Sequence, residues 1–376
     1  MTTMAEPLDV CIRGSGIVAH ALALLLARDR LRVGLVAAPA ASGPVHAPDV
    51  RAYALNHASR TLLESVRCWP EAPAVTPVRH MHVHGDQGGE LRFDAAEQGV
   101  PALGWIVDVP VLEAQLAQAV RFQAQIELLD APAPAALTAV CEGRASATRA
   151  EFGVEFEATP YHQHALATRI ECEHPHNGTA RQWFTAQGDI LAFLPLGEPQ
   201  DHTVAIVWSV SPTDAERLRQ SDAADFCREL ETVSQHALGT LQLSSPRMVW
   251  PLQKAQARTW CGRSAAGAWV LAGDAAHNVH PLAGQGLNLG LADVAELARV
   301  LHARESWRSV ADLRLLRRYE RARKAGMLPL DAGMDGLQLL FTRSDPVCGA
   351  LRNWGLQGVQ RSGPLKQWLA RRAMNF

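Results

Sequence analysis

The sequence predicts an α/β protein in which a Rossmann-like domain is interleaved with an antiparallel-sheet domain and followed by C-terminal helices. Three observations predict this class. A strand at residues 9–13 runs through Gly14-Ser-Gly16 into a helix and a second strand, which is the order of a dinucleotide-type βαβ unit. Residues 269–290 hold another strand, a loop and a helix start. Residues 161–210 alternate as short strands with short turns, a pattern typical of an antiparallel sheet.

The first βαβ unit closes with a strand at residues 31–36. Gly14 permits the tight turn, Gly16 permits close approach of a pyrophosphate, and Ala19 lets the helix pack closely on the strand. An acidic residue that holds an adenosine ribose normally follows the second strand. Residues 36–38 read Val-Ala-Ala instead, so we expect a weaker hold on the cofactor.

Residues 269–290 carry the strongest signal in the chain. A carboxylate at a strand end can accept hydrogen bonds from ribityl hydroxyls, and glycines with a free helix start favour close approach of a phosphate. An ordinary strand-loop-helix connection is the alternative interpretation. The candidate cofactor contacts in this stretch are Gly273, Asp274, Pro281, Gly284, Gln285, Gly286 and Asn288.

This stretch, GDAAHNVHPLAGQGLNLGLAD, resembles the second flavin-binding motif of the aromatic-ring hydroxylases of the para-hydroxybenzoate hydroxylase type. It is most similar to the branch that hydroxylates prenylated phenols in ubiquinone biosynthesis. The resemblance implies an FAD-dependent monooxygenase in which a flavin hydroperoxide transfers a hydroxyl to an electron-rich phenol. Electrons would come from NADH, NADPH or a separate reductase. Because the flavin supplies the reactivity, no side chain is assigned as the catalyst.

Other segments match the same family. Arg51, in a D-x-R segment, is a candidate flavin contact, although a lone arginine is more often a solvated charge. Glu142 and Gly143 stand where the family has Asp-Gly, a motif that serves flavin and nicotinamide nucleotide. Residues 319–323 read Y-E-R-x-R, again as in the family. Pro281 is expected to border the flavin ring.

His277 is a candidate acid or base because histidine titrates near neutrality. A structural role, fixing the loop after Asp274, is the interpretation we favour. His80, His82 and His84 share one face of a hairpin predicted at residues 79–94. Because no Cys, Asp or Glu completes a convincing ligand set in the sequence, we predict no metal site.

The predicted domains are discontinuous. The FAD-binding domain comprises residues 1–66, 101–155 and 245–310, the substrate domain 67–100 and 156–244, and the C-terminal helical region 311–376. One helix is expected over 212–238 and two more over 285–303 and 311–341. The Pro/Ala-rich passage at 121–136 is shorter than in the family.

The composition excludes several classes of binding partner and covalent structure. The formal charge is −2 with no basic stripe, which argues against nucleic acid, and seven scattered cysteines argue against a disulfide framework. No signal peptide or membrane span is predicted. We expect a cytoplasmic protein, or one peripheral to the inner membrane, that takes a small aromatic substrate and O₂. Contact with a membrane or a biosynthetic complex, the oligomeric state and the ring position hydroxylated are left open.

Two competing hypotheses remain. A non-catalytic accessory protein on a flavoprotein scaffold would explain residues 36–38, Glu142 and the shortened passage, but not the intact Gly273-Asp274 segment. A nicotinamide-only dehydrogenase would leave residues 273–290 without a purpose.

Overall fold

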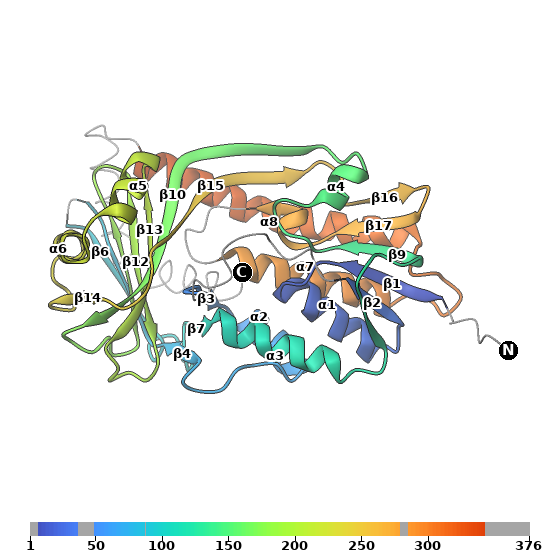
Figure 1. Ribbon diagram of the computed structural model, residues 1–376, viewed down its shortest axis with the longest axis horizontal. Helices are drawn as coiled ribbons and strands as arrows, with labels where there is room; N and C mark the ends of the chain where they lie inside the picture. Colours follow the sequence, from blue (N-terminus) through green and yellow to red (C-terminus); the bar gives the residue numbers. More distant parts are fainter. Residues whose placement is uncertain (1–6, 37–48, 87, 279–284, 343–376) are drawn as a thin grey trace.

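The computed structural model describes residues 7–36, 49–86, 88–278 and 285–342. Two large sheets lie at opposite ends of an elongated molecule, and the long strands β10 (Phe156–Cys172) and β15 (Met248–Ala257) run from one end toward the other (Figure 1). The cofactor-type sheet is at the right of this view, with α1, α3 and α7 beneath it.

The six-stranded sheet has the order β16-β17-β9-β1-β2-β8. All neighbours in it pair in parallel except β16 and β17, which are antiparallel. Its strands are β1 (Leu8–Arg13), β2 (Val33–Val36), β8 (Ile126–Leu129), β9 (Ala135–Val140), β16 (Cys261–Ser264) and β17 (Gly267–Leu271).

The nine-stranded sheet has the order β18-β15-β10-β13-β12-β11-β5-β6, and β14 pairs with β10. The strands not yet bounded are β5 (His80–His84), β6 (Glu90–Asp94), β11 (Thr179–Phe184), β12 (Ile190–Leu196), β13 (Thr203–Val210), β14 (Leu241–Leu243) and β18 (His277–Asn278). A three-stranded sheet, β3-β7-β4, consists of β3 (Ala52–Leu55), β4 (Val75–Val78) and β7 (Gly104–Asp108).

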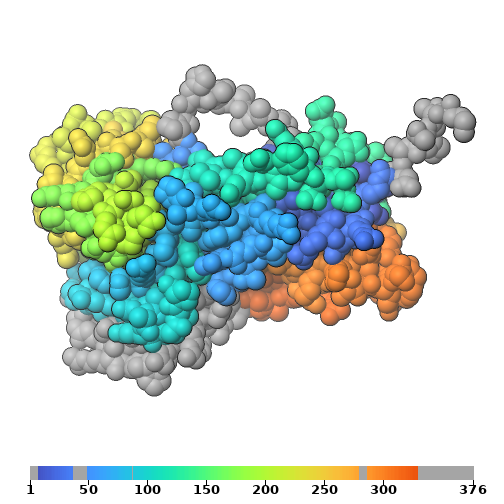
Figure 2. Space-filling model, turned by 90° about the horizontal axis from the view of Figure 1, so that it is seen from below, coloured from blue at the N-terminus to red at the C-terminus, as the bar shows by residue number. Residues whose placement is uncertain are grey.

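The helices cover these sheets. They are α1 (Ile17–Arg28), α2 (His57–Ser65), α3 (Val109–Arg121), α4 (Ala147–Glu151), α5 (Pro212–Gln220), α6 (Ala223–Val233), α7 (Gln285–His302) and α8 (Leu313–Thr342), with a short 3₁₀ turn over Gly273–Ala275. Helix α1 is apolar on nearly every side because it is buried between the sheet, α3 and α7. Seen from below, the blue start of the chain lies beside the orange α7 segment (Figure 2).

The nine-stranded sheet has two different faces because side chains alternate along each strand. One face carries Trp183, Leu191 and Phe193, which pack with residues of α5 and α6. The other face carries Ala180 and Ala205, which pack against the three-stranded sheet. We call these the helix-covered face and the inner face.

The predicted fold class, a Rossmann-like sheet with a second, antiparallel sheet, was confirmed. Two predicted segments have a different secondary structure. The helix expected over 212–238 is two helices, because Asp222 caps α6 by accepting a hydrogen bond from the amide of Ala224. The passage at 121–136 holds β8 and the start of β9, which were not expected. The predicted domain division remains a proposal. Strand β10 begins at its border at residue 156, and β15 begins just after its border at residue 245. No helix among the described residues is long and apolar enough to cross a membrane.

Candidate active site

Three glycine motifs lie at one edge of the six-stranded sheet. Strands β17, β9 and β1 are parallel neighbours, so their carboxyl ends meet. Gly14 follows β1, Glu142-Gly143 follows β9, and Gly273-Asp274 follows β17. The chain leaves β1 for β2 on one side, while β9 lies on the other. Such a switch in strand order opens the crevice in which α/β sheets bind ligands.

Helix α1 begins at this crevice. Gly14 has φ +134°, and a Cβ there would lie 2.3 Å from the backbone oxygen of Cys141, so only glycine fits. Gly16 is the N-cap of α1; among the described residues no side chain caps this end, and its first turn has no acidic residue. A Cβ on Gly16 would meet nothing within 4 Å. The open space and the unpartnered amides suit a phosphate. Ala19 is fully buried between helix and sheet.

The Glu142 carboxylate braces its own loop. It accepts hydrogen bonds from Ser146 Oγ at 2.7 Å, from the Thr148 amide at 3.0 Å and from Thr148 Oγ1 at 2.6 Å. The extra methylene relative to the family's aspartate is therefore accommodated at the start of α4. Gly143 faces open space, so this loop presents backbone to the crevice.

Arg149, which the sequence analysis missed, joins two of the motif loops. Its buried guanidinium donates from Nη1 to the backbone oxygen of Ala275 at 3.1 Å and from Nη2 to that of Arg144 at 2.8 Å. It also lies 3.5 Å from the centroid of the Phe156 ring. Its position three residues after the helix-capping Ser146 could have placed Arg149 in the first turn of α4. Its partner at Ala275 is distant in sequence and could not be predicted.

Asp274 lies in the 3₁₀ turn after β17, largely buried. Burial raises the pKa of its carboxyl above the ordinary value. The side-chain Nδ2 of Asn278 donates to Asp274 Oδ2 at 3.5 Å, a long contact. A buried carboxylate with weak donors gains most from further hydroxyl donors, which is the chemistry a ribityl chain offers.

Arg51 directly precedes β3. Its guanidinium is paired with Asp49, the aspartate of the D-x-R segment. Its Nη2 lies 2.6 Å from Asp49 Oδ2 and 3.3 Å from Glu113 Oε1. These contacts raise the pKa of the guanidinium, the hydrogen bond with Asp49 first. Burial raises the pKa of the Tyr53 hydroxyl; nearby Arg51 lowers it, and the Asp274 carboxylate raises it further. The start of β3 therefore lies near the Gly-Asp turn.

A buried ionic network lies beneath the Gly-Asp turn. Asp293 of α7 accepts hydrogen bonds from the Gly273 amide at 2.9 Å, from His277 Nε2 at 2.6 Å and from Arg323 Nε at 2.7 Å. Burial alone would raise the pKa of Asp293, but His277 and Arg323 outweigh it and lower that pKa. The network ties β17, α7 and α8 together.

His277 is part of that network. The residue is 2% exposed, and its ring stacks on Trp260 with centroids 4.9 Å apart and planes inclined by 17°. This is the geometry of a residue that fixes the loop after Asp274. It leaves little room for a substrate proton at the imidazole.

Asn288 is committed to the neighbouring elements. Its Oδ1 accepts from the Asn56 amide at 3.0 Å and from Ser59 Oγ at 2.7 Å, and its Nδ2 donates to the Ala54 oxygen at 2.8 Å. The side chain thus docks α7 on β3 and α2, and a cofactor contact would fall to its backbone.

Several candidates fall outside the described residues. They are Pro281 and Gly284, together with positions 37–38 of the missing acidic site. Gln285 is the first residue of α7, and a Cβ on Gly286 would meet nothing within 4 Å.

These residues fit an FAD. The α1 end offers amides to a pyrophosphate, Asp274 offers a buried acceptor to hydroxyls, and Gly16, Gly143 and Gly286 border open space. The inner face of the nine-stranded sheet carries partly exposed apolar residues, including Ala192 and Leu194 of β12 and Val207 of β13.

Comparison with known proteins agrees with this geometry. The model of the FAD binding domain family matches residues 133–327, more than half of the chain. The chain is 30% identical over 402 residues to the 3-demethoxyubiquinol 3-hydroxylase of Escherichia coli, covering 99% of each. It is 30% identical over 397 residues to the ubiquinone hydroxylase UbiL of Rhodospirillum rubrum, covering 97% of this chain and 89% of that one.

Solved structures share the fold. The p-nitrophenol 4-monooxygenase PnpA of Pseudomonas putida has a TM-score of 0.74 at 18% identity and 98% coverage of both chains. PqsL of Pseudomonas aeruginosa, a probable FAD-dependent monooxygenase, has a TM-score of 0.73 at 21% identity, covering 94% of this chain and 100% of that one. The chain belongs to the FAD-dependent monooxygenase family that carries this FAD-binding domain.

Proposed function

We propose that this chain is an FAD-dependent monooxygenase that hydroxylates the ring of an electron-rich phenol in ubiquinone biosynthesis, with a prenylated phenol as substrate. One observation carries the proposal. The glycine motifs after β1, β9 and β17 converge on a single crevice together with Asp274. The relatives named as ubiquinone hydroxylases support the substrate class.

The residues have separable roles in this proposal. Gly14, Gly16 and the first amides of α1 would hold the pyrophosphate. Asp274 would accept from ribityl hydroxyls, and Arg51, neutralised in part by Asp49, would stand beside the cofactor. Ala19, Glu142 and Asn288 would act by packing and by positioning the elements that carry these groups.

Bound FAD supplies the redox chemistry: it activates O₂ so that one oxygen atom enters the ring and the other leaves as water, with two electrons from NADH, NADPH or a reductase. The chain contributes position and exclusion of water. Arg149 and Asp293 hold the loops around the crevice, and the inner sheet face offers an apolar surface to the ring. We assign no proton transfer to His277 because Asp293 and Trp260 enclose its ring.

A prenylated substrate resides in lipid. Transfer of an apolar tail favours burial by about 0.8 kcal/mol for each CH₂, so this substrate class entails contact with a membrane surface or a delivering partner. The half-buried apolar side chains of β12 and β13 are the surface we propose for the ring and the start of the tail.

Oxygen consumption by the FAD-loaded protein tests the proposal. Each donor, NADH, NADPH and a reductase, is supplied with a prenylated phenol in detergent or with the same phenol lacking its tail. We expect substrate-dependent O₂ uptake, one atom of ¹⁸O from ¹⁸O₂ in the ring, and preference for the prenylated phenol. Hydroxylation of only the tail-less phenol would overturn the substrate class. A loaded enzyme that transfers no oxygen to either phenol would overturn the reaction.

A further inference from the structure

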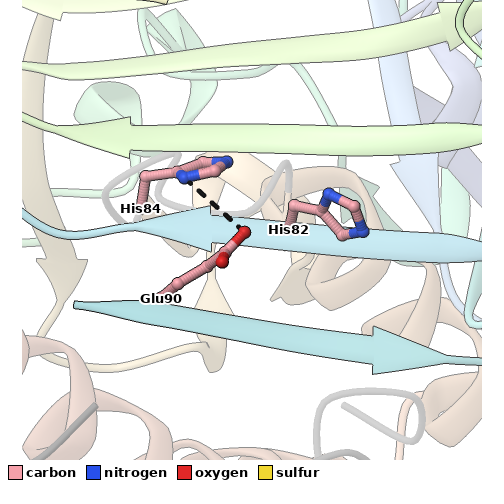
Figure 3. A group of neighbouring side chains, drawn as sticks. All are labelled: His82, His84 and Glu90. Atoms are coloured by element: carbon pink, nitrogen blue, oxygen red, sulfur yellow. Dashed lines mark ion pairs between the residues drawn. The ribbon is translucent and has the colours of Figure 1, made fainter. Parts of the chain in front are cut away.

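The β5–β6 hairpin gathers three side chains that can ligate a metal ion. His82 and His84 project from β5, and Glu90 of β6 lies directly opposite His84 in the antiparallel ladder (Figure 3). One ligand atom from each of the three lies within 4.8 Å of the others. No metal site was predicted from the sequence because no Cys, Asp or Glu completed a convincing ligand set, and the register of the hairpin supplies Glu90.

The spacing is close to that of a metal site. His84 Nδ1 lies 3.9 Å from Glu90 Oε1. Ligands on a tetrahedral zinc ion, with bonds of about 2.1 Å, lie about 3.4 Å apart. Small side-chain rotations at partly exposed positions would close the difference. Two imidazoles and one carboxylate, with an open fourth position, are a known zinc ligand set.

The surroundings keep one imidazole in place. The His84 ring stacks on Trp183 of β11, with centroids 5.3 Å apart and planes inclined by 9°. Stacking limits its rotation and leaves Nδ1 directed at Glu90 (Figure 3). Burial lowers the pKa of both His82 and His84, which favours the neutral form that metals bind.

Two arginines oppose a cation here. Arg92 holds Glu90 through Nε at 2.7 Å and Nη2 at 2.9 Å, and Arg181 lies near both imidazoles. The Arg92–Glu90 pair is partly exposed, and ion pairs open to solvent contribute only about 0–1 kcal/mol. A metal with two imidazole ligands can therefore displace Arg92 from Glu90.

The site is separate from the crevice. His82 and His84 pair in register with Arg181 and Trp183 of β11, and Trp183 belongs to the helix-covered face. The inner face points the other way. An ion at this position would cross-link β5 to β6 at the sheet edge and would not take part in oxygen transfer.

We propose that His82, His84 and Glu90 form a site for a divalent transition-metal ion, with Zn²⁺ the best match, which clips the β5–β6 hairpin. The test uses tag-free, FAD-loaded, full-length protein. Zn²⁺ binding is measured by calorimetry, and Co²⁺ serves as a spectroscopic probe of coordination. We expect one ion per chain, Co²⁺ bands without thiolate charge transfer, and a higher thermal midpoint with Zn²⁺.

Variants identify the ligands. His84→Ala and Glu90→Gln should weaken Zn²⁺ binding at least about tenfold. His80→Ala is the matched control, since His80 lies on the same strand as the two ligands but faces Asp94 of β6. This variant should bind Zn²⁺ as the parent does. Arg92→Ala should bind Zn²⁺ more tightly, because it removes the guanidinium that competes for Glu90 and repels the cation. Absence of Zn²⁺ binding by the parent, thiolate bands with Co²⁺, or equal losses in His80→Ala and His84→Ala would overturn the proposal.

Discussion

The cofactor crevice and the substrate sheet are built by different rules. At the crevice, the chain turns sharply at Gly14 and Gly273, both with positive φ, and backbone groups come within contact of one another. Buried charge at Asp293 is fully paired. On the inner face of the nine-stranded sheet, apolar residues alternate along each strand with residues of the helix-covered face. Backbone geometry requires no particular residue type at these positions.

The difference explains why the cofactor can be read from motifs and the substrate cannot. A glycine with φ +134° or a paired buried carboxylate admits few substitutes. An apolar wall can be assembled from many combinations of side chains of similar volume. Mutations should therefore act on stability and FAD affinity at the crevice, but on substrate affinity at the sheet.

The largest effect is expected at Asp293. Asp293→Ala would leave the buried His277 and the partly buried Arg323 without their shared acceptor, a loss of about 3–5 kcal/mol in the free energy of unfolding. Urea denaturation measures it. Glu296→Ala on the same helix is the control, since the Glu296–Arg299 pair is partly exposed, and it should change stability by under about 1 kcal/mol. Similar losses in both variants would contradict the role of the network.

Gly14 and Gly16 separate backbone constraint from cofactor space. Gly14→Ala places a Cβ against the Cys141 oxygen at a strained φ, which should cost at least about 1–3 kcal/mol of stability and weaken FAD binding. Gly16→Ala meets open space, so the apoprotein should keep its stability while FAD affinity falls. Denaturation and FAD titration of both variants provide the test. Unchanged FAD affinity in Gly16→Ala would show that the cofactor does not approach this turn.

Ala192 probes the other region. Ala192→Trp fills the inner face and should raise KM for the phenol roughly tenfold or more, without changing FAD affinity. Steady-state kinetics and FAD titration measure the two quantities. Ala186→Trp, in the exposed turn after β11, is the control and should keep the parent KM. An unchanged KM in Ala192→Trp would place the substrate elsewhere.

Asp274 distinguishes a binding residue from a structural one. Burial raises its pKa, so the ionised side chain opposes folding at neutral pH. Asp274→Asn should therefore be at least as stable as the parent but bind FAD several-fold more weakly. Thermal unfolding of the apoprotein and FAD titration test both parts. A destabilised variant with parental affinity would reverse the assignment.

The smallest effect concerns pH at the substrate sheet. Burial raises the pKa of Asp189 from 3.8 to about 6. The folded state then binds more protons between these values, so stability falls as pH rises from about 4 to about 6 and levels off above. Asp189→Asn should lose this decline and gain about 1 kcal/mol near pH 7, after allowance for solvent screening. Chemical denaturation at each pH measures these stabilities. Asp225→Asn, on the exposed surface of α6, is the control and should retain the decline of stability with pH.

Prediction from sequence succeeded where a residue type is dictated locally. Gly14 and Gly273 follow from the turns they form, and the 79–94 hairpin from its alternation and glycines. Arg149 and Asp293 were missed because their partners, Ala275 and Arg323, are brought close only by the fold. Glu90 could have been predicted as a neighbour of His84, because pairing residues outward from the hairpin turn places the two opposite each other. The split of the 212–238 helix depended on a cap at Asp222.

FAD binding at the crevice is tested most directly by titration of the purified, folded chain with FAD, followed by visible absorption and flavin fluorescence. We predict saturable binding of one FAD per chain, with shifted and resolved flavin bands, and weaker binding by Gly16→Ala. No binding by the folded parent at FAD concentrations well above micromolar would contradict a cofactor site at this crevice.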